Sequence, residues 1–341
     1  MLHFESDYVE GAHPNVLRAL LETNHIPASG YGTDTFTASA KAKIATACQL
    51  ENAQVSLLVG GTQTNAIVID AVLRAYEGVI AADTGHINQY EAGAIEYTGH
   101  KVLTLPHEAG KLNADSLREY LVAFFANPNH IHMVLPGMVY ISQPTEYGTL
   151  YSKKELQALS QVCRDYQLPL FIDGARLGYA LVAESNDVTL ADIAHYADVF
   201  YIGGTKIGAL CGEAVVFTKQ NEPTNWTRFV KKHGALLAKG RLLGVQFDAL
   251  FTEQLYLTVS RHAVDMAMQI KQSLVAKGYE LYVDSSTNQQ FAVLTPEQLA
   301  QISPFVKVGY GGVLADKRVI VRFVTSWSTT QAQVDALVAV L

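Results

Sequence analysis

The sequence of 341 residues predicts an α/β fold, with a large domain built on about seven mostly parallel strands and a smaller C-terminal α+β domain. From about residue 55, short β-branched runs alternate with helical stretches, which is the pattern of parallel strands joined by helices. After Thr224 long helical stretches dominate until residue 276, and short strands return only beyond that point. We therefore place the large domain at residues 1–245 and the small domain at residues 246–341, and we treat the N-terminal segment as a candidate to pack on the small domain.

The expected strands of the large domain are short apolar runs that end at polar or glycine-rich turns. They cover residues 55–59, 79–82, 101–105, 132–141, 169–172, 199–202 and 214–217. Helices separate them, for example at residues 152–166 and from the glycine turn at 60–61 to residue 76. In the small domain we expect an antiparallel sheet of strands at residues 280–283, 290–294, 305–310 and 319–324, with helices at residues 296–302 and 330–341.

Composition and charge exclude several classes of protein. The chain is 49% hydrophobic and 17% charged, which suits a globular core and does not suit a disordered chain. Its net charge of −7 and pI near 5.9 lack the basic surface that nucleic-acid binding needs. The three cysteines are widely spaced and no metal-binding motif occurs, so neither disulfides nor a metal site are expected. There is no signal-like start and no apolar run long enough to span a bilayer, which predicts a cytoplasmic protein that binds no membrane.

Ligands of open α/β sheets bind at the carboxyl ends of the strands, and the turn from Gly60 to Asn65 is the first such place. Its glycines allow the close approach of an anion, to which helix N–H groups and the Thr62 hydroxyl can donate hydrogen bonds. A phosphate monoester fits this arrangement. The missing third glycine and the missing Walker lysine disfavour NAD and ATP. The alternative is an ordinary glycine turn with a polar cap.

Asp173 and Lys206 follow two successive apolar strands, so both are expected at the same edge of the sheet. A carboxylate at the mouth of a buried strand needs a cationic or hydrogen-bonding partner, and the pyridinium N–H of a ligand would supply one. Glycines and small apolar residues surround Lys206, and desolvation there would lower the pKa of its amine, as formation of a Schiff base at neutral pH requires. The alternatives are a helix-capping Asp173, a salt bridge from Asp173 to Arg176, and a lysine that simply lies on the surface.

His86 follows another expected strand, where its imidazole could stack on an aromatic ring or be an ordinary structural histidine. Arg322 lies inside an apolar strand, where a cation is costly without an anionic partner. A substrate carboxylate would supply that partner; otherwise Arg322 faces water from an edge strand. The basic stretch from Lys231 to Arg241 indicates a solvated helical face that could also meet a phosphate across an oligomer interface.

Taken together, these residues resemble the low-specificity L-threonine aldolases, a branch of the fold-type I enzymes that depend on pyridoxal 5'-phosphate (PLP) and include the β-eliminating lyases. The resemblance runs over nearly the whole chain through seven ordered matches. They are Ser6-Asp7, Tyr31-Gly32 with Asp34, Gly61-Thr62, His86-Ile87 with Tyr90-Glu91, the run from Asp173 to Arg176, Lys206, and the run from Arg322 to Thr325. The resemblance implies a fold-type I PLP-dependent transferase-like architecture.

The same resemblance implies a role for each matched residue. Lys206 would form the internal aldimine, Asp173 would pair with the pyridine nitrogen, and His86 would stack on the ring. The implied cofactor-binding residues are Gly61, Thr62, His86, Asp173, Arg176, Lys206 and, across the interface of a homotetramer, Arg241. The implied substrate-binding residues are Ser6, Tyr31, Arg176 and Arg322, of which Ser6, Arg176 and Arg322 would hold the carboxylate.

The chain departs from the family pattern at three places. Tyr8 stands where members usually have threonine, the segment from Ser142 to Thr145 replaces a frequent Thr-His-Asn segment, and Ser326 replaces a usual histidine. All three bear on the pocket around the substrate side chain.

The function implied is retro-aldol cleavage of a β-hydroxy-L-amino acid, of the threonine, allo-threonine or phenylserine type, to glycine and an aldehyde. PLP would accept the electrons of the Cα–Cβ bond, and Asp173 would keep its ring nitrogen protonated. We expect His86 or a bound water to take the proton of the β-hydroxyl group. Two alternatives stay open: a PLP-dependent β-eliminating lyase or aminotransferase on the same fold, and a non-catalytic protein that binds another phosphate ligand.

Overall fold

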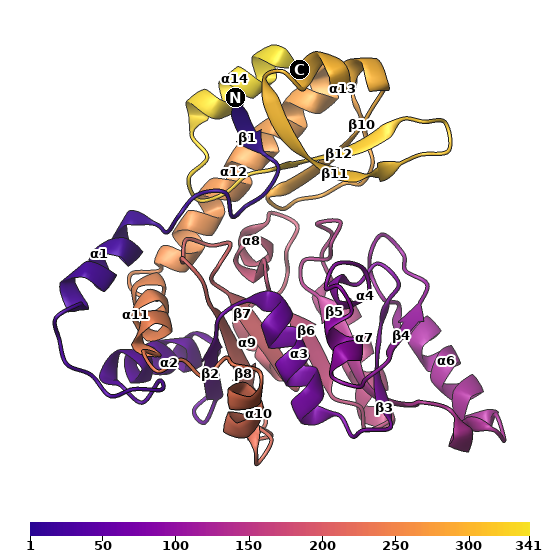
Figure 1. Ribbon diagram of the computed structural model, residues 1–341. Helices are drawn as coiled ribbons and strands as arrows, with labels where there is room; N and C mark the ends of the chain where they lie inside the picture. The colour runs from indigo at the N-terminus through magenta and orange to yellow at the C-terminus, as the bar shows by residue number, and fades with distance from the viewer.

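The computed structural model describes residues 1–341 and contains two β-sheets of different size (Figure 1). The larger sheet has seven strands in the order β2-β8-β7-β6-β5-β3-β4. They are β2 (Gln54–Leu58), β3 (Glu77–Ala82), β4 (Val102–Leu105), β5 (Leu135–Ser142), β6 (Leu170–Asp173), β7 (Val199–Gly203) and β8 (Glu213–Phe217). All neighbours are parallel except β8, which runs antiparallel to both β7 and β2. The predicted α/β class and mostly parallel sheet are confirmed.

The central strands of the larger sheet are buried on both faces, which is why they consist of continuous apolar runs. Alternate residues of one strand enter different cores: Ile172 packs in the largest hydrophobic cluster, and Phe171 packs in a second one. The helices of this part of the chain are α3 (Gly61–Val72), α4 (His86–Gln89), α5 (Ala94–Tyr97), α6 (Ala114–Ala126), α7 (Lys153–Asp165), α8 (Leu177–Val182), α9 (Leu190–Tyr196) and α10 (Trp226–Lys232).

The N-terminal residues contribute to both sheet regions. β1 (Leu2–Phe4) pairs in parallel with β11 (Val306–Val313) of the smaller sheet. α1 (Pro14–Thr23) and α2 (Thr35–Ala47) then follow, and both pack against α11 (Arg241–Leu250). The chain therefore leaves the smaller sheet directly after β1.

The smaller sheet has five strands in the order β1-β11-β12-β10-β9. β9 (Glu280–Leu281), β10 (Gln289–Leu294), β12 (Val319–Val324) and β11 form an antiparallel set. The helices α12 (Leu255–Ala276), α13 (Pro296–Ile302) and α14 (Gln331–Val340) complete this region, whose separate core includes Phe4, Ile270 and Phe323. α12 contacts both α8 and α14, so it connects the two sheet regions, and both chain termini lie at the smaller sheet (Figure 1).

One expected strand begins later in the structure than predicted. β5 begins at Leu135 rather than at residue 132, because residues His130–His132 form a short 3-10 helix whose N–H groups bond back to the preceding turn. The helical stretches expected between residues 226 and 276 are the three helices α10, α11 and α12. Gly234 (φ 70°) follows the first of these helices, and Glu253 and Gln254 (φ 49° and 57°) separate the second from the third, because a left-handed residue cannot continue a helix. No helix is long and apolar enough to cross a membrane.

Candidate active site

Asp173 is the last residue of β6 and lies buried at the carboxyl end of the larger sheet. Its Oδ1 accepts hydrogen bonds from the Tyr201 hydroxyl (2.5 Å) and from the backbone N–H of Ala175 (2.9 Å). Its Oδ2 accepts hydrogen bonds from the Tyr140 hydroxyl (2.6 Å) and from Asn65 Nδ2 (3.0 Å). Tyr140 and Tyr201 lie on β5 and β7, the two neighbours of β6, so three adjacent strands build this cluster.

The electrostatics of the cluster keep Asp173 ionised. Burial by itself would raise the pKa of its carboxyl group, but the charge of His86, when its ring is protonated, and the hydroxyls of Tyr140 and Tyr201 lower that pKa below its ordinary value. Burial and the Asp173 charge raise the pKa of both tyrosines well above the ordinary value, so they stay neutral donors. A buried anion at a strand end suits the cationic N–H of a ligand.

His86 is the first residue of α4 and follows β3. Its backbone N–H donates to Glu146 Oε1 (2.9 Å), and its ring nitrogen Nδ1 lies 2.8 Å from Glu91 Oε1. The same Glu91 oxygen accepts a hydrogen bond from Asn65 Nδ2 (2.8 Å). Because that oxygen acts as an acceptor, we assign the ring proton to Nδ1, which leaves Nε2 with a free lone pair. Asn65 thus donates hydrogen bonds both to Glu91, which orients His86, and to Asp173.

Lys206 lies partly buried in the loop between β7 and β8. The Tyr179 hydroxyl donates a hydrogen bond to its backbone carbonyl (2.5 Å), which fixes the loop at that point. Burial, together with the Arg176 charge, lowers the pKa of the Lys206 amine, and nearby acids counteract part of this shift. Asp173 is one of these acids, so the structure brings together the two charged residues that the sequence placed at one edge of the sheet.

The N-terminus of α3 belongs to the same site. Its N-cap residue, Gly60, provides no side-chain hydrogen bond to the first turn, so the N–H groups there are available to an anion. Thr62 is exposed at this end of the helix. A Cβ at Gly61 would lie 3.2 Å from the Tyr201 hydroxyl, which itself binds Asp173. The glycine turn that was predicted to bind an anion therefore lies close to Asp173.

Arg176 pairs with Asp7 rather than with Asp173. Its Nε and Nη2 donate to the two carboxylate oxygens of Asp7 at 2.6 and 3.0 Å, and Asn288 Nδ2 also donates to Asp7 (3.0 Å). Ser6 lies buried next to Asp7 in the N-terminal segment. Asp7 follows β1, Arg176 follows β6 and Asn288 precedes β10. Their hydrogen bonds therefore connect the two sheet regions at the site.

Arg322 lies in β12, opposite Gly309 of β11, and has no carboxylate partner. Its Nη1 donates to Gln289 Oε1 (3.0 Å), Nη2 lies 3.5 Å from the backbone carbonyl of Glu5, and Nε is buried without a hydrogen bond. A Cβ at Gly309 would lie 3.0 Å from Nε, so glycine makes room for the guanidinium group. Burial, reinforced by the Arg176 charge, lowers the pKa of Arg322. An additional anion would therefore be stabilised here.

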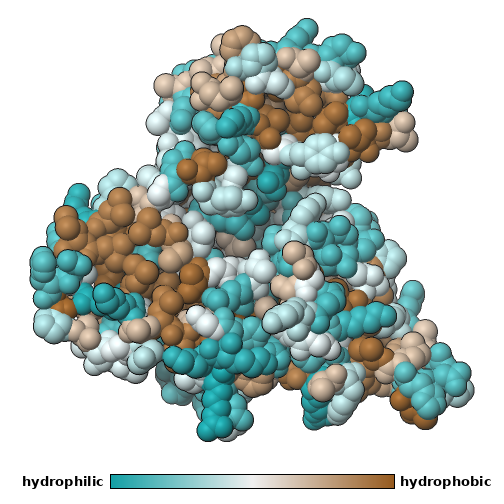
Figure 2. All heavy atoms as spheres, viewed as in Figure 1, coloured by the Kyte–Doolittle hydropathy of each residue, from teal (hydrophilic) through white to brown (hydrophobic).

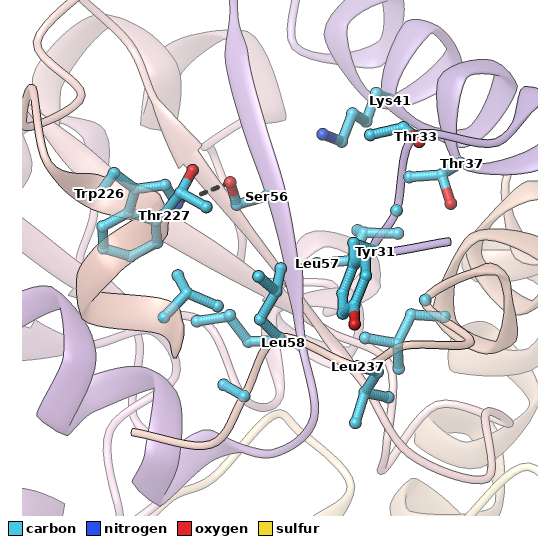
Figure 3. Close-up of a pocket in the computed structure, with 16 residues that line it drawn as sticks. Tyr31, Thr33, Thr37, Lys41, Ser56, Leu57, Leu58, Trp226, Thr227 and Leu237 are labelled. Atoms are coloured by element: carbon cyan, nitrogen blue, oxygen red, sulfur yellow. Dashed lines mark hydrogen bonds between the residues drawn. The ribbon is translucent and has the colours of Figure 1, made fainter. Parts of the chain in front are cut away.

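Tyr31 and Arg241 do not join this cluster within one chain. Tyr31 is exposed and lines a separate cavity of about 310 Å³; of the other residues that line this cavity, Trp226 donates a hydrogen bond to Ser56 Oγ (2.7 Å) (Figure 3). Arg241 is the first residue of α11, and its guanidinium group donates to two backbone carbonyls at and just after the end of α1. Both side chains lie apart from the residues around Lys206.

Several side chains of the site were not assigned a role from the sequence. Tyr140 and Tyr201 each interrupt an apolar strand, and a buried hydroxyl needs a partner, so the sequence carried a usable signal for both. The sequence contained no such signal for Asn65 and Glu146, because each is an ordinary polar residue near the end of an expected element. Asp7 was part of the family resemblance, but its pairing with a distant arginine depends on the fold.

The chain is similar to known proteins of one family over most of its length. A model of the beta-eliminating lyase family matches residues 3–297. The low-specificity L-threonine aldolase of a Pseudomonas species is 31% identical over 347 residues, which covers 98% of this chain and 96% of that protein. A threonine aldolase structure from Leishmania major is similar with a TM-score of 0.96 at 40% identity and covers 100% of this chain and 98% of that chain. A variant of the aspartate aminotransferase from Thermus thermophilus shares the fold alone, with a TM-score of 0.72, 16% identity, and coverage of 100% and 96%.

The family match spans most of the chain, and both threonine aldolases cover nearly all of it. The resemblance inferred from the seven sequence matches is confirmed, and so is the predicted fold-type I architecture. The chain therefore belongs to the beta-eliminating lyase family and is a PLP-dependent carbon–carbon lyase of the threonine aldolase type.

Proposed function

We propose that this protein cleaves β-hydroxy-L-amino acids such as threonine to glycine and an aldehyde, with PLP held by Lys206. The observation that carries the proposal is the convergence of an ionised buried acid, an amine of lowered pKa and an uncapped helix N-terminus in one site. Each of the three suits one part of PLP, namely the ring nitrogen, the aldehyde and the phosphate. The residues present therefore fit this cofactor.

Asp173 would hold the protonated ring nitrogen of PLP. Tyr140, Tyr201 and Asn65 donate to its carboxylate and keep it ionised, so it can stabilise a positive N–H. Two buried oxygens nearby, Asn65 Oδ1 and Glu91 Oε2, have no hydrogen-bond partner within the chain, as expected where a polar ligand completes a site. When bound, PLP supplies an electron sink for the electrons of the broken Cα–Cβ bond.

Arg322 would bind the substrate carboxylate. Its Nε has no partner, and the charge of Arg176 adds to the positive potential there. A carboxylate that accepts hydrogen bonds from Arg322 would offset the cost of burying the guanidinium group and would fix the orientation of the amino acid. Ser6, buried beside Asp7, is the neutral member of this carboxylate site.

His86 would take the proton of the substrate β-hydroxyl group at Nε2. Glu91 holds the proton on Nδ1 and so fixes the tautomer in which Nε2 is basic. Glu146 accepts a hydrogen bond from the backbone N–H of His86 and thereby positions the start of α4. As the Cα–Cβ bond breaks, the hydroxyl proton moves to Nε2 and the oxygen becomes the carbonyl oxygen of the aldehyde.

The proposed enzyme is a homo-oligomer in which Tyr31 and Arg241 act at a neighbouring subunit. Large apolar side chains are exposed on and after α1, at Leu17 (46%), Leu21 (75%) and Ile26 (48%). Figure 2 shows a broad apolar surface where Figure 1 places α1 and α11. Contiguous apolar surfaces of this kind mark protein interfaces. Light scattering on the purified protein should therefore give the mass of an oligomer, and the family resemblance leads us to expect a tetramer.

Incubation with L-threonine tests the reaction. The expected products are glycine and acetaldehyde in equal amounts, and Lys206→Ala should form neither. Release of ammonia and a keto acid would indicate β-elimination instead, and transfer of the amino group to an added keto acid would indicate transamination. A protein that catalyses none of these and binds a phosphate ligand equally well without Lys206 would be the non-catalytic alternative.

A further inference from the structure

Glu213 is a buried acid close to Lys206 that has no role in the reaction described above. It is the first residue of β8, lies opposite Gly203 of β7 and is 3% exposed. Its Oε1 accepts a hydrogen bond from Thr205 Oγ1 (2.7 Å), and its Oε2 accepts one from the backbone N–H of Gly204 (3.2 Å). Gly204 and Thr205 directly precede Lys206 in the chain, so Glu213 anchors the loop that carries the lysine.

A neutral side chain could anchor this loop at lower cost. Both hydrogen-bond donors to Glu213 are uncharged, and burial raises the pKa of its carboxyl group to about 8, although the Thr205 hydroxyl and the Lys206 charge act in the opposite direction. The charged groups that face Glu213 are Lys206 and Asp173, and the other titratable neighbours are Tyr201, Tyr256 and Cys211. Lys206 is the one cation in this set, so an acid at this position acts on the lysine.

We propose that Glu213 is a positioning residue for Lys206: it anchors the lysine loop through Gly204 and Thr205 and, once it is ionised, favours the ammonium form of the lysine. This role rests on the proposed function, in which Lys206 holds the cofactor.

The direction of the effect follows from the charges around Lys206. Burial and Arg176 lower the pKa of its amine, whereas Asp7, Asp173 and Glu213 raise it. Glu213 acts in this way only when it is ionised, which requires a pH above about 8. Replacing Glu213 by glutamine should therefore leave the amine unchanged near neutral pH and make it lose its proton more readily in alkaline solution.

Competitive acylation of Lys206 tests this proposal. Full-length wild type, Glu213→Gln and a control, Glu222→Gln, are freed of PLP and treated with a trace of acetic anhydride over a range of pH. Mass spectrometry then reports how fast the Lys206 amine is acylated at each pH. Glu222 is a suitable control because burial also raises the pKa of its carboxyl group, but the lysine that it affects is Lys41.

In Glu213→Gln, acylation of Lys206 should match the wild type near neutral pH and become up to about tenfold faster above pH 8, because a nearby opposite charge shifts an amine pKa by about one unit. Glu222→Gln should follow the wild type throughout. Superimposed curves for the wild type and Glu213→Gln would overturn the proposal, and so would an equal change in Glu222→Gln.

Thr205→Val provides a second variant in case Glu213→Gln does not fold. It removes the hydroxyl that lowers the pKa of Glu213, so Glu213 should ionise at higher pH and Lys206 should be acylated faster than in the wild type above pH 8. Unchanged acylation would again overturn the proposal. These measurements use protein without PLP, so they test the role of Glu213 alone. The proposed function fails separately, if the wild-type protein does not bind PLP at Lys206.

Discussion

Replacing Arg322 by methionine separates binding of the substrate carboxylate from stability of the fold. In the free protein this guanidinium group has one close hydrogen bond, from Nη1 to Gln289 (3.0 Å), and its Nε has none. A substrate carboxylate can accept two charge-assisted hydrogen bonds from it, each worth about 1.5–3 kcal/mol. At the lower end the loss is about 3 kcal/mol, which is about a hundredfold decrease in kcat/KM. Steady-state rates on L-threonine, followed through acetaldehyde formation, measure this decrease.

The same substitution should leave the fold nearly as stable as before. It deprives Gln289 of a donor, which costs about 1–3 kcal/mol, but it also removes an unpaired buried nitrogen and the repulsion from Arg176, which offsets a similar amount. We expect the free energy of unfolding in urea to change by less than about 1 kcal/mol. Arg318→Met, at an arginine just before β12 that pairs with surface acids, is the control and should keep the wild-type kcat/KM. If Arg322→Met lost several kcal/mol of stability and kept its kcat/KM, Arg322 would be a structural residue.

Two further substitutions test the other charged groups of the site. Asp7→Asn should destabilise the protein by about 3–5 kcal/mol in urea at neutral pH, because it leaves the guanidinium group of Arg176 without its carboxylate. Burial raises the pKa of Asp7, but Arg176 and Lys206 together lower it below its ordinary value. The stabilisation is therefore complete above about pH 4 and is lost as the pH falls through the pKa of the folded state, so a difference between wild type and variant that persists in acid would contradict this origin. Asp173→Asn should lower kcat on L-threonine by about 10²–10³-fold, because it removes the charge that would hold the ring nitrogen, and a decrease of less than tenfold would show that the charge is not required.

Most of the fold could be predicted from the pattern of apolar runs. The seven strands of the larger sheet were expected because each is a short apolar run closed by a glycine, a proline or a polar residue. The antiparallel direction of β8 was not predictable, because the apolar pattern of a strand does not depend on its direction. β1 was not expected because it has only three residues, and α2 because its alanines and threonines give it no distinct apolar face.

The site could be predicted where the end of a strand determines the position of a side chain. Asp173 ends β6 and Lys206 follows the adjacent strand β7, so the order of the sheet brings them together. The partner of Arg176 was not predictable, because Asp7 reaches it only when the N-terminal segment folds back onto the site. The same holds for Tyr140, whose hydroxyl meets Asp173 only because β5 lies next to β6.

Reduction with borohydride tests most directly whether Lys206 holds the cofactor. The purified wild type should absorb visible light before reduction and lose that absorption afterwards, and peptide mass spectrometry should then locate the reduced PLP group on Lys206 alone. Lys206→Ala should carry no such group. A PLP group trapped on another lysine, or a wild type that takes up no PLP, would contradict the assignment of this amine.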